Sequence, residues 1–393
     1  MLAGLIFAVR DAEDRPDRLA ATLPFAGSTL IEYQARLLAS AGASQIVVVV
    51  AKLTPDLLGA IGRVGKRGIA VDAVRSAAEA AEKLHPLSRV LMLADGLVTT
   101  EPLVRPLASE GADALLVVGE EEAGPEFERI GGRLAWAGAA RLSHARLRDA
   151  SLMPRDWDLQ SALLRVASQA GAAHLLLPPG AAAEGHGVEQ RAAGLDARGR
   201  TVLAAAMSDA RGPFDRWVVA PIARRALPAL VARGTPAAGL ALAGAVLGAL
   251  GLAGVYADYS AIGVLLALVA VMVWTLGATL AKLRDEPRLG RGQEVAAMAL
   301  PALTALLLGA RLTHWAGEAT QLVLAIALLT LGGLAERAIS GRERLALWGG
   351  PGAYLLVLLV ASMAGAPSVG LAAAAAYAAA TLGAAIEGLR RNA

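Results

Sequence analysis

The sequence predicts a chain of two parts, in which an α/β domain is followed by an all-α membrane domain of six spans. Of the 393 residues, 56% are hydrophobic and 18% are charged, whereas soluble chains are about 45–50% apolar. Residues 1–235 carry most of the charge, and residues 236–389 are largely Ala, Leu, Val and Gly. Composition therefore separates a soluble part from a membrane part. The chain has no Cys, which excludes disulfides and Cys-ligated metals.

Residues 1–205 are predicted to form the α/β domain, because short apolar runs alternate there with helix-like stretches. Strands are expected at Leu5–Val9, Gln45–Val50, Val90–Leu93 and Ala114–Val118, and helices at Leu30–Ala41, Ser76–Leu84 and Leu159–Val166. Continuous apolar strands are typical of a sheet covered on both faces. The N-terminus lacks a basic segment and a small-residue cleavage site, which favours a buried first strand and a cytoplasmic domain over a signal peptide.

The segment Leu23–Tyr33 reads LPFAGSTLIEY. It resembles the P-x-x-G-x-P-L-I-x-Y segment of the sugar-phosphate nucleotidyltransferase family, and the resemblance covers roughly residues 3–180. It implies a Rossmann-like fold in which Asp95, after the strand Val90–Leu93, is the carboxylate that holds Mg²⁺. Asp95 could equally begin a simple turn. Asp156–Asp158 could supply a second metal carboxylate or begin a helix.

The loop after the first strand departs from that family. Residues Val9–Pro16 read VRDAEDRP, with three acids and no Gly, whereas the family's G-x-G-x-R/K loop offers backbone N–H groups to phosphates. The acids Glu120–Glu122, Glu126 and Glu128 are interpreted as a solvated loop. CTP or a CDP-alcohol is the ligand that the resemblance implies, at a site that has lost part of its phosphate cradle.

Residues 206–235 are predicted to form a linker and a helix lying in the membrane interface. The apolar side of this helix would consist of Phe214, Trp217, Val218, Ile222, Leu227 and Leu230, and the basic side of Arg216, Arg224, Arg225 and Arg233. Trp and Arg suit the lipid head-group region. The preceding stretch, Ala181–Arg200, is either a mobile connection or the closing strands of the first domain.

Residues 236–393 contain six apolar runs, near 237–257, 260–281, 294–310, 319–335, 346–365 and 367–388. A helix needs about 20 residues to cross the hydrocarbon core. The loops and flanks on one side carry fourteen Lys and Arg residues, and those on the other side carry only Arg311. Because positive residues mark the cytoplasm, we expect a multi-pass protein of the inner (cytoplasmic) membrane with the N-terminal domain and both termini in the cytoplasm.

The stretch Trp274–Met298 joins the second and third spans. It resembles the active-site region of the CDP-alcohol phosphatidyltransferase family, D-x-x-D-G-x-x-A-R followed by G-x-x-x-D-x-x-x-D, with Ala281, Lys282 and Gly290 at the matching A-R pair and later Gly. The four Asp positions are occupied by Trp274, Gly277, Glu294 and Met298. The resemblance implies Mg²⁺ or Mn²⁺ bound by carboxylates at these four positions. Only Glu294 remains as an oxygen ligand, which argues against a strong metal site.

The loop between these spans is basic, with Lys282, Arg284, Arg288 and Arg291. These residues could bind a phosphorylated head group or anionic lipid, or act only as topology signals. The fused arrangement resembles bifunctional inositol-phosphate cytidylyltransferase/CDP-inositol phosphotransferase proteins. Two functions stay open, an enzyme of phospholipid or polar head-group synthesis with altered chemistry and a non-catalytic subunit that binds lipid, nucleotide or a partner. A homodimer in the bilayer is expected, and a nucleic-acid partner is not.

Overall fold

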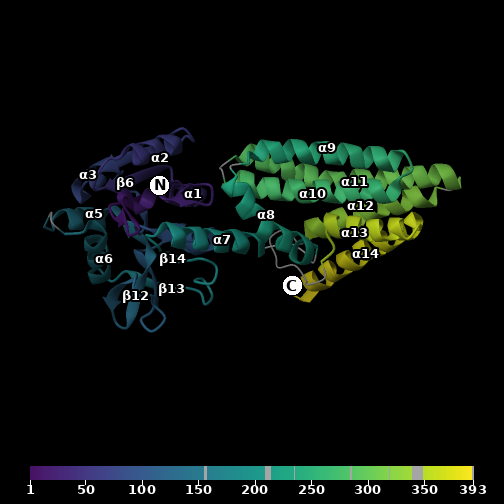
Figure 1. The fold of residues 1–393 in the computed structure, drawn as a ribbon. Helices are drawn as coiled ribbons and strands as arrows, with labels where there is room; N and C mark the ends of the chain where they lie inside the picture. The colour runs from purple at the N-terminus through teal and green to yellow at the C-terminus, as the bar shows by residue number, and fades with distance from the viewer. Residues whose placement is uncertain are drawn as a thin grey trace. The chain divides into compact units, whose positions relative to one another are not determined.

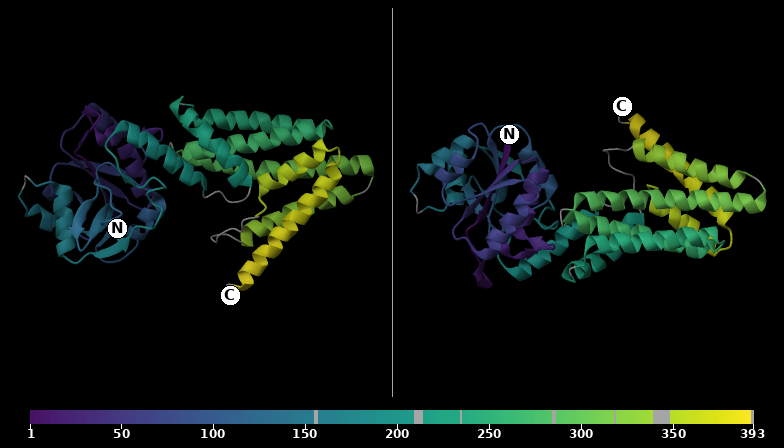
Figure 2. Two further views of the ribbon diagram at one scale, coloured as in Figure 1. Left: turned by 60° about the horizontal axis from the view of Figure 1, so that its bottom comes forward. Right: turned by 90° about the horizontal axis from the view of Figure 1, so that it is seen from above.

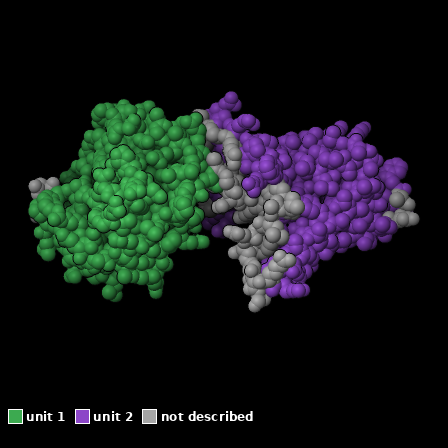
Figure 3. Space-filling model, turned by 90° about the horizontal axis from the view of Figure 1, so that it is seen from below, with its two compact units in different colours: residues 1–205 green, residues 206–393 purple. Residues whose placement is uncertain are grey.

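A computed structural model describes residues 1–154, 157–208, 214–233, 235–283, 286–317, 319–338 and 348–391. The chain divides into two compact units, residues 1–205 and residues 206–393 (Figure 3). Unit 1 contains the β-sheet, and unit 2 contains the long apolar helices (Figures 1 and 2).

Unit 1 is built on a mixed sheet, which among the described residues has eight strands. The strand order is β13-β10-β12-β8-β1-β6-β7, with β11 beside β12. β1 is parallel to both β6 and β8, and β12 is antiparallel to β8 and β10. The strands are β1 Leu2–Ala8, β6 Gln45–Val50, β7 Ala70–Val74, β8 Arg89–Leu93, β10 Ala114–Gly119, β11 Glu128–Gly131, β12 Leu134–Ser143 and β13 Ala173–Leu176. The predicted α/β fold of this part is confirmed.

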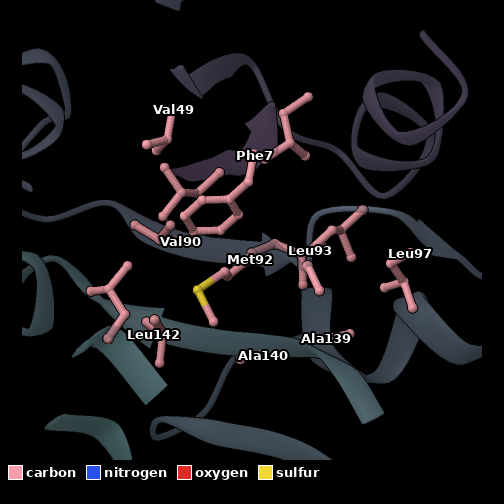
Figure 4. Close-up of a cluster of buried hydrophobic side chains, with 14 of the residues drawn as sticks. Phe7, Val49, Val90, Met92, Leu93, Leu97, Ala139, Ala140 and Leu142 are labelled. Carbon is pink, nitrogen blue, oxygen red and sulfur yellow. The ribbon is translucent and has the colours of Figure 1, made fainter. Parts of the chain in front are cut away.

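The core of unit 1 lies on the central strands of this sheet. Phe7 of β1, Met92 of β8 and Leu142 of β12 are buried and belong to one hydrophobic cluster (Figure 4). The runs that form β1, β6 and β8 are apolar at nearly every position because helices cover both faces of the sheet.

Helices and short strands complete unit 1. The helices are α1 Leu30–Ser40, α2 Pro55–Gly65, α3 Ala77–Lys83, α4 Glu101–Ala108, α5 His144–Ser151, α6 Leu159–Gln169 and α7 Ala192–Ser208, with a 3₁₀ turn at Ala20–Thr22. Two-stranded pairs are formed by β2 Asp11–Ala12 with β3 Arg15–Leu19, β4 Pro24–Phe25 with β5 Ser28–Thr29, and β9 Leu97–Val98 with β14 Gly187–Val188. The stretch 181–200 thus supplies a closing strand and the start of α7, and Leu195 of α7 is buried beside Phe25.

The nucleotidyltransferase-like segment Leu23–Tyr33 folds into a tight hairpin followed by α1. Gly27 has a φ of +88° in the turn of this hairpin, a conformation that favours glycine. The buried Glu32 carboxylate accepts hydrogen bonds from the Thr29 backbone N–H at 3.1 Å and hydroxyl at 2.7 Å, which caps the helix. Tyr33 donates its hydroxyl proton to the carbonyl oxygen of Thr99 at 2.5 Å, so the segment is fixed to the loop that follows β9.

All regular secondary structure in the described residues of unit 2 is helical. It contains a π-helical turn at Asp215–Val219 followed by α8 Ala220–Ala232, α9 Ala237–Tyr256, α10 Ser260–Leu283, α11 Pro287–Ala316, α12 Thr320–Ala338, α13 Pro351–Met363 and α14 Pro367–Arg391. α9, α10 and α11 pack side by side, and α14 packs against α12 and α13 (Figure 1). Within the part of the chain that the structure describes, five helices are long and apolar enough to cross a membrane: α9, α10, α11, α12 and α14.

The expected span near 346–365 is a shorter helix than predicted. α13 has 13 residues, about 20 Å at about 1.5 Å per residue, because Gly350 is extended and Pro351 occupies the first helical turn. The non-helical backbone before it is satisfied by side chains. Gly349 N–H donates to the Thr381 hydroxyl at 3.3 Å, and the Tyr354 hydroxyl donates to the Gly349 carbonyl at 3.0 Å. Such pairing is what irregular backbone requires at membrane depth.

The expected interfacial helix, α8 with the turn before it, divides its apolar residues between two sides. Phe214 and Leu227 are buried in the core of unit 2, whereas Trp217 and Ile222 are exposed. The Arg216 guanidinium lies 5.8 Å from the centre of the Trp217 ring. The exposed side therefore combines Trp with Arg, as head-group regions favour.

Charge placement predicts how unit 2 crosses the membrane, including whether α13 completes a crossing. We expect reporters fused after Arg288 and after Ala393 to lie in the cytoplasm, and a reporter after Arg311 to lie on the other side. Cysteine-accessibility or enzyme-fusion reporters measure this. Arg288 and Arg311 reporters on the same side would contradict the crossing of α11, and an external Ala393 reporter would show that α13 does not cross.

Candidate functional site

The edge of the sheet where β1 and β8 end gathers the first candidate residues. Asp95 follows β8 and is buried, with an exposed fraction of 3%. Its Oδ2 accepts hydrogen bonds from the backbone N–H groups of Val9 and Arg10, both at 2.8 Å, and its own N–H donates to the Gln160 side chain at 2.9 Å. Asp95 therefore ties the loop after β1 to β8 and α6. Its Oδ1 is buried and has no hydrogen-bond partner among the described residues.

Burial is the main influence on this carboxyl group. It raises the pKa of Asp95 to about 6, with a smaller contribution from the negative charge of Asp158, while the N–H groups of Arg10 and Val9 act in the opposite direction. A buried carboxylate with one unpartnered oxygen is a candidate ligand for a divalent cation. Asp95 and Gly96 do form a turn between β8 and β9, and the buried carboxylate is the feature that makes this turn a candidate cation site.

The pKa of Asp95 predicts a pH-dependent stability. The folded value of about 6 exceeds the ordinary 3.8, so the folded state holds the proton more tightly. The resulting stabilisation is fully present below the unfolded value and is lost as the pH rises through about 6. A pKa difference corresponds to about 1.4 kcal/mol per unit. Ionisation of Asp95 therefore lowers the unfolding free energy of unit 1 by about 3 kcal/mol. We expect Asp95→Asn to remove this dependence.

The measurement is the thermal midpoint of unit 1 in the full chain, in metal-free buffer, at several pH values. The difference between Asp95→Asn and the wild type should shift in favour of the variant as the pH rises through the pKa of Asp95. Any pH-independent change in stability that the amide of the Asp95→Asn variant causes cancels when the pH profiles are compared. Parallel pH profiles for the two proteins would contradict the raised pKa.

Two more acids lie near Asp95. Asp158 is the N-cap of α6, and its Oδ1 accepts the Ser161 N–H at 2.9 Å. The Ser161 hydroxyl donates to Glu128 at 2.9 Å. Burial raises the pKa of Glu128, and Asp158 adds to this effect. Asp158 is therefore a helix N-terminus that also faces the acids, whereas Asp156 lies outside the described residues.

Beside these acids, an open hollow of about 500 Å³ runs between β11 and α6. Polar, charged and aromatic side chains line it, among them Arg129, Trp157 and Arg165. Arg165 already lies over the Trp157 ring at 5.4 Å, and Arg129 is paired with Glu120 at 2.8 Å. The hollow thus opens next to Asp158 and Glu128, and the two guanidinium groups that line it among the described residues both have a neighbouring partner.

The acids in the loop after β1 are held by neighbouring groups. Asp11 pairs with Lys52 at 2.6 Å, Glu13 pairs with Arg191 at 2.8 Å, and Asp14 accepts the Ala192 N–H at 2.9 Å. These contacts offset the negative charge that the three acids give to the loop. The loop is joined to residues 189–192 through the Glu13 N–H, which donates to the Gln190 carbonyl at 3.1 Å.

Sequence reasoning missed the segment 187–192 as part of this edge. β14 pairs with β9, and the Glu189 N–H donates to the Gly96 carbonyl at 2.9 Å. The Glu189 carboxylate accepts the N–H groups of Gln190 and Arg191 at 3.1 and 3.0 Å. In a single sequence this segment looks like a Gly- and Ala-rich connection, and only the pairing of β9 with β14 places Glu189 beside Asp95-Gly96.

The second candidate site is the seam between α10 and α11, where the stretch Trp274–Met298 that resembles the phosphotransferase motif lies. Trp274, at the first Asp position, donates its indole N–H to the Ala241 carbonyl of α9 at 3.0 Å. Its ring packs against Gly244, where an added Cβ would overlap it, and against Gly248. The indole therefore fills the space between α9 and α10 and offers no ligand to a cation.

At the second Asp position, Gly277 faces a buried glutamine. The Gln293 side chain is 2% exposed, and its amide N–H donates to the Ala237 carbonyl at 3.3 Å. A Cβ added at Gly277 would overlap the Gln293 Oε1 atom, which has no hydrogen-bond partner among the described residues. Gln293 thus joins α9, α10 and α11 where a metal ligand is expected, and an acid at position 277 would have no room.

The remaining positions of the motif also serve packing or lie on the surface. The Lys282 ammonium group forms an ion pair with the Glu294 carboxylate. Gly290 is buried close to Ala278, and Met298 is exposed. Glu294 therefore offers an oxygen that a lysine already neutralises, and the side chains at this seam do not fit a two-metal centre.

The basic residues near this seam are not equivalent. Arg288 and Arg291 are exposed at the start of α11, whereas Lys282 is engaged with Glu294. Arg284 lies outside the described residues. Across the described part of both units, His, Cys, Asp and Glu side chains form no group of three or more that could hold a metal ion.

Comparisons with known proteins give structural neighbours of low sequence identity and low TM-score. No family model and no curated protein matches the chain. Similar solved structures include the inositol-1-phosphate CTP transferase from T. maritima, with 14% identity and a TM-score of 0.35, covering 45% of this chain and 85% of that chain. A UDP-glucose pyrophosphorylase in complex with UDP-glucose has 10% identity and a TM-score of 0.36, covering 51% and 98%. A UDP-glucose pyrophosphorylase from Acinetobacter baumanii has 10% identity and a TM-score of 0.36, covering 52% and 93%. Similarity at this level defines no activity for this chain.

Proposed function

We propose that this chain is a membrane protein of phospholipid or polar head-group metabolism whose helical unit binds its ligand without CDP-alcohol phosphotransfer. The observation that supports the proposal is the filled seam between α10 and α11. Trp274 contacts α9 and Gly277 packs against Gln293 of α11, and Glu294 is paired with Lys282. Two-metal transfer needs carboxylates shared by two ions about 3.5–4 Å apart. An enzyme with altered chemistry would need ligands from outside these positions.

For unit 1 we propose that CTP or a CDP-alcohol binds at the sheet edge, with Mg²⁺ or Mn²⁺ held by Asp95. Calorimetric titration of the full chain with CTP and Mg²⁺ tests this. We expect binding that is lost in Asp95→Asn and kept in Asp196→Asn, a matched change at an acid of α7 that pairs with Arg200 on the surface. Absence of CTP binding, or binding that survives in Asp95→Asn, would contradict the proposal.

For unit 2 we propose that Arg288 and Arg291 bind the phosphates of anionic lipids. Both are exposed at the end of a candidate span, where basic residues attract negative head groups by about 1 kcal/mol each. Lipids that co-purify with the protein can be identified by mass spectrometry. We expect less anionic lipid on Arg288→Gln/Arg291→Gln than on the wild type and on Arg105→Gln. Equal anionic-lipid content in the wild type and the double variant would contradict the proposal and would indicate that Arg288 and Arg291 act only as topology signals.

We propose that the protein is a homodimer in the cytoplasmic membrane and that it acts with a catalytic partner. The supply of small residues on α9 permits close helix packing. Mass measurement in mild detergent tests the dimer, and a monomer at all concentrations would contradict it. Co-purification from native membranes tests the partner, and recovery of this chain alone would argue against it.

A further inference from the structure

One end of the α9–α11 bundle carries a cluster of aromatic and charged residues that the proposed function does not use. Three large aromatic side chains are exposed there: Tyr256 by 63%, Tyr259 by 66% and Trp315 by 72%. Tyr256 ends α9, Tyr259 precedes α10, and Trp315 lies in the last turn of α11. Because α9, α10 and α11 follow one another through short connections, this end lies opposite the end with Lys282.

The polar parts of this cluster are bonded to one another. Asp258 accepts hydrogen bonds from the Arg311 guanidinium, at 3.2 Å from Nε and 2.5 Å from the terminal nitrogen. The Trp315 indole N–H donates to the same carboxylate at 3.2 Å. The guanidinium also lies 5.0 Å from the centre of the Tyr256 ring. The Tyr256 and Trp315 rings are thus held while they remain exposed, and the charged groups beside them are paired.

This chemistry is that of a membrane–water interface. Tyr and Trp rings place an apolar body beside lipid and a polar group beside water, and they gather at both borders of a bilayer. Arg311 lies near the end of the apolar span Arg288–Trp315, where an unpaired cation would be costly. Asp258 neutralises the Arg311 charge, so Arg311 needs no negatively charged lipid head group as a partner. The cluster therefore suits a membrane interface whose lipids need not be anionic.

The length of α11 agrees with this placement. From Arg288 to Trp315 the helix rises about 40 Å, at about 1.5 Å per residue. A bilayer with its head-group regions is about 40–45 Å thick. A span that begins at the exposed Arg288 therefore ends at the opposite head-group level with Trp315.

We infer that Tyr256, Tyr259 and Trp315 form the surface with which unit 2 contacts the lipid head groups on the side opposite Lys282, and that the Asp258–Arg311 pair holds the Tyr256 and Trp315 rings in place. The inference rests on the proposed membrane location. It adds the depth at which the bundle sits and the residues that set this depth.

The absence of Cys makes single-cysteine labelling direct. Nitroxide labels are placed at Ala257→Cys beside the cluster, at Val246→Cys on the exposed side of α9, and at Glu121→Cys in an exposed turn of unit 1. The full chain is reconstituted in phosphatidylcholine vesicles, and depth is read from the accessibility of each label to oxygen and to a water-soluble nickel chelate. We expect the 257 label at head-group level, the 246 label in the hydrocarbon and the 121 label in water.

The three labels distinguish the inference about the depth of the bundle from the proposed membrane location. A 257 label in bulk water or deep in the hydrocarbon, with the 246 label in the hydrocarbon, would overturn the inference and keep the membrane location. A 246 label in water would overturn the membrane location itself. Replacing Tyr259 and Trp315 together by Ser should shift the 257 label away from head-group level, and replacement by Phe should shift it less. An unchanged depth in the Ser variant would show that these rings do not set it.

Discussion

A carboxylate introduced at position 277 is expected to destabilise the helical unit instead of creating a metal site. In Gly277→Asp the new side chain would overlap the Gln293 Oε1 atom and approach the Leu240 Cβ at 3.1 Å. Overpacking costs about 1–3 kcal/mol, and an unpaired buried charge costs about 3–5 kcal/mol. We therefore expect a loss of at least about 3 kcal/mol in unfolding free energy by these terms.

The unfolding of the purified protein in mixed micelles measures this loss, and Mn²⁺ binding is followed in parallel. Gly292→Asp is the matched control, because Gly292 is exposed on the neighbouring helix α11 and has no atom near an added Cβ. Shortening the partner in Gly277→Asp/Gln293→Ala should recover part of the stability. A stable Gly277→Asp protein that gains tight Mn²⁺ binding would contradict the filled seam.

Removal of the Trp274 side chain should have the second large effect. The indole fills the space beside Gly244 and Gly248 and donates to the Ala241 carbonyl at 3.0 Å. Trp→Ala changes in packed sites cost about 3–5 kcal/mol, whereas loss of one hydrogen bond costs about 0.5–1.5 kcal/mol. We expect Trp274→Ala to lose several-fold more unfolding free energy than Trp274→Phe.

The same unfolding measurement compares the two variants. Trp274→Phe keeps most of the ring volume and removes only the indole N–H. Equal and small losses in both variants would mean that the space between α9 and α10 does not depend on this ring.

The fold of unit 1 could be predicted wherever burial on both faces gave a continuous apolar run. Gln45–Val50 was predicted as a strand and forms β6 with the same bounds. β7 was missed because it is an edge strand with Asp72 in its middle and little burial. α2 was missed because its Gly-rich sequence buries only Leu57, Ala60 and Val64. Edge elements depend on pairing with strands distant in sequence, which local patterns do not show.

The helices of unit 2 were predictable from length and apolarity, but their ends were not. The third run was expected near 294–310, whereas α11 extends over Pro287–Ala316 because charged residues at its start continue the helix. The fifth run contained Gly349, Gly350 and Pro351, and these residues limit α13 to 13 residues. Backbone chemistry, more than hydropathy, decides where these helices begin.

The candidate sites could be predicted only in part. Spacing placed Asp95 at the end of a central strand, but its hydrogen bonds to Val9 and Arg10 require the β1–β8 register. Likewise, the motif positions Trp274 and Gly277 were named from sequence, whereas Gln293 was not. A buried amide can be identified only once α10 and α11 are packed against each other, because the same residue could face water in an isolated helix.

The central claim is that the helical unit does not carry out two-metal phosphotransfer, and a transfer assay tests it most directly. Labelled CDP-alcohols are supplied with Mg²⁺ or Mn²⁺ to the wild type and to Glu294→Gln, and metal affinity is measured on both. Because Lys282 already holds the Glu294 carboxylate, we expect weak or no transfer and little change in metal affinity. Robust turnover by the wild type that Glu294→Gln abolishes would contradict the account.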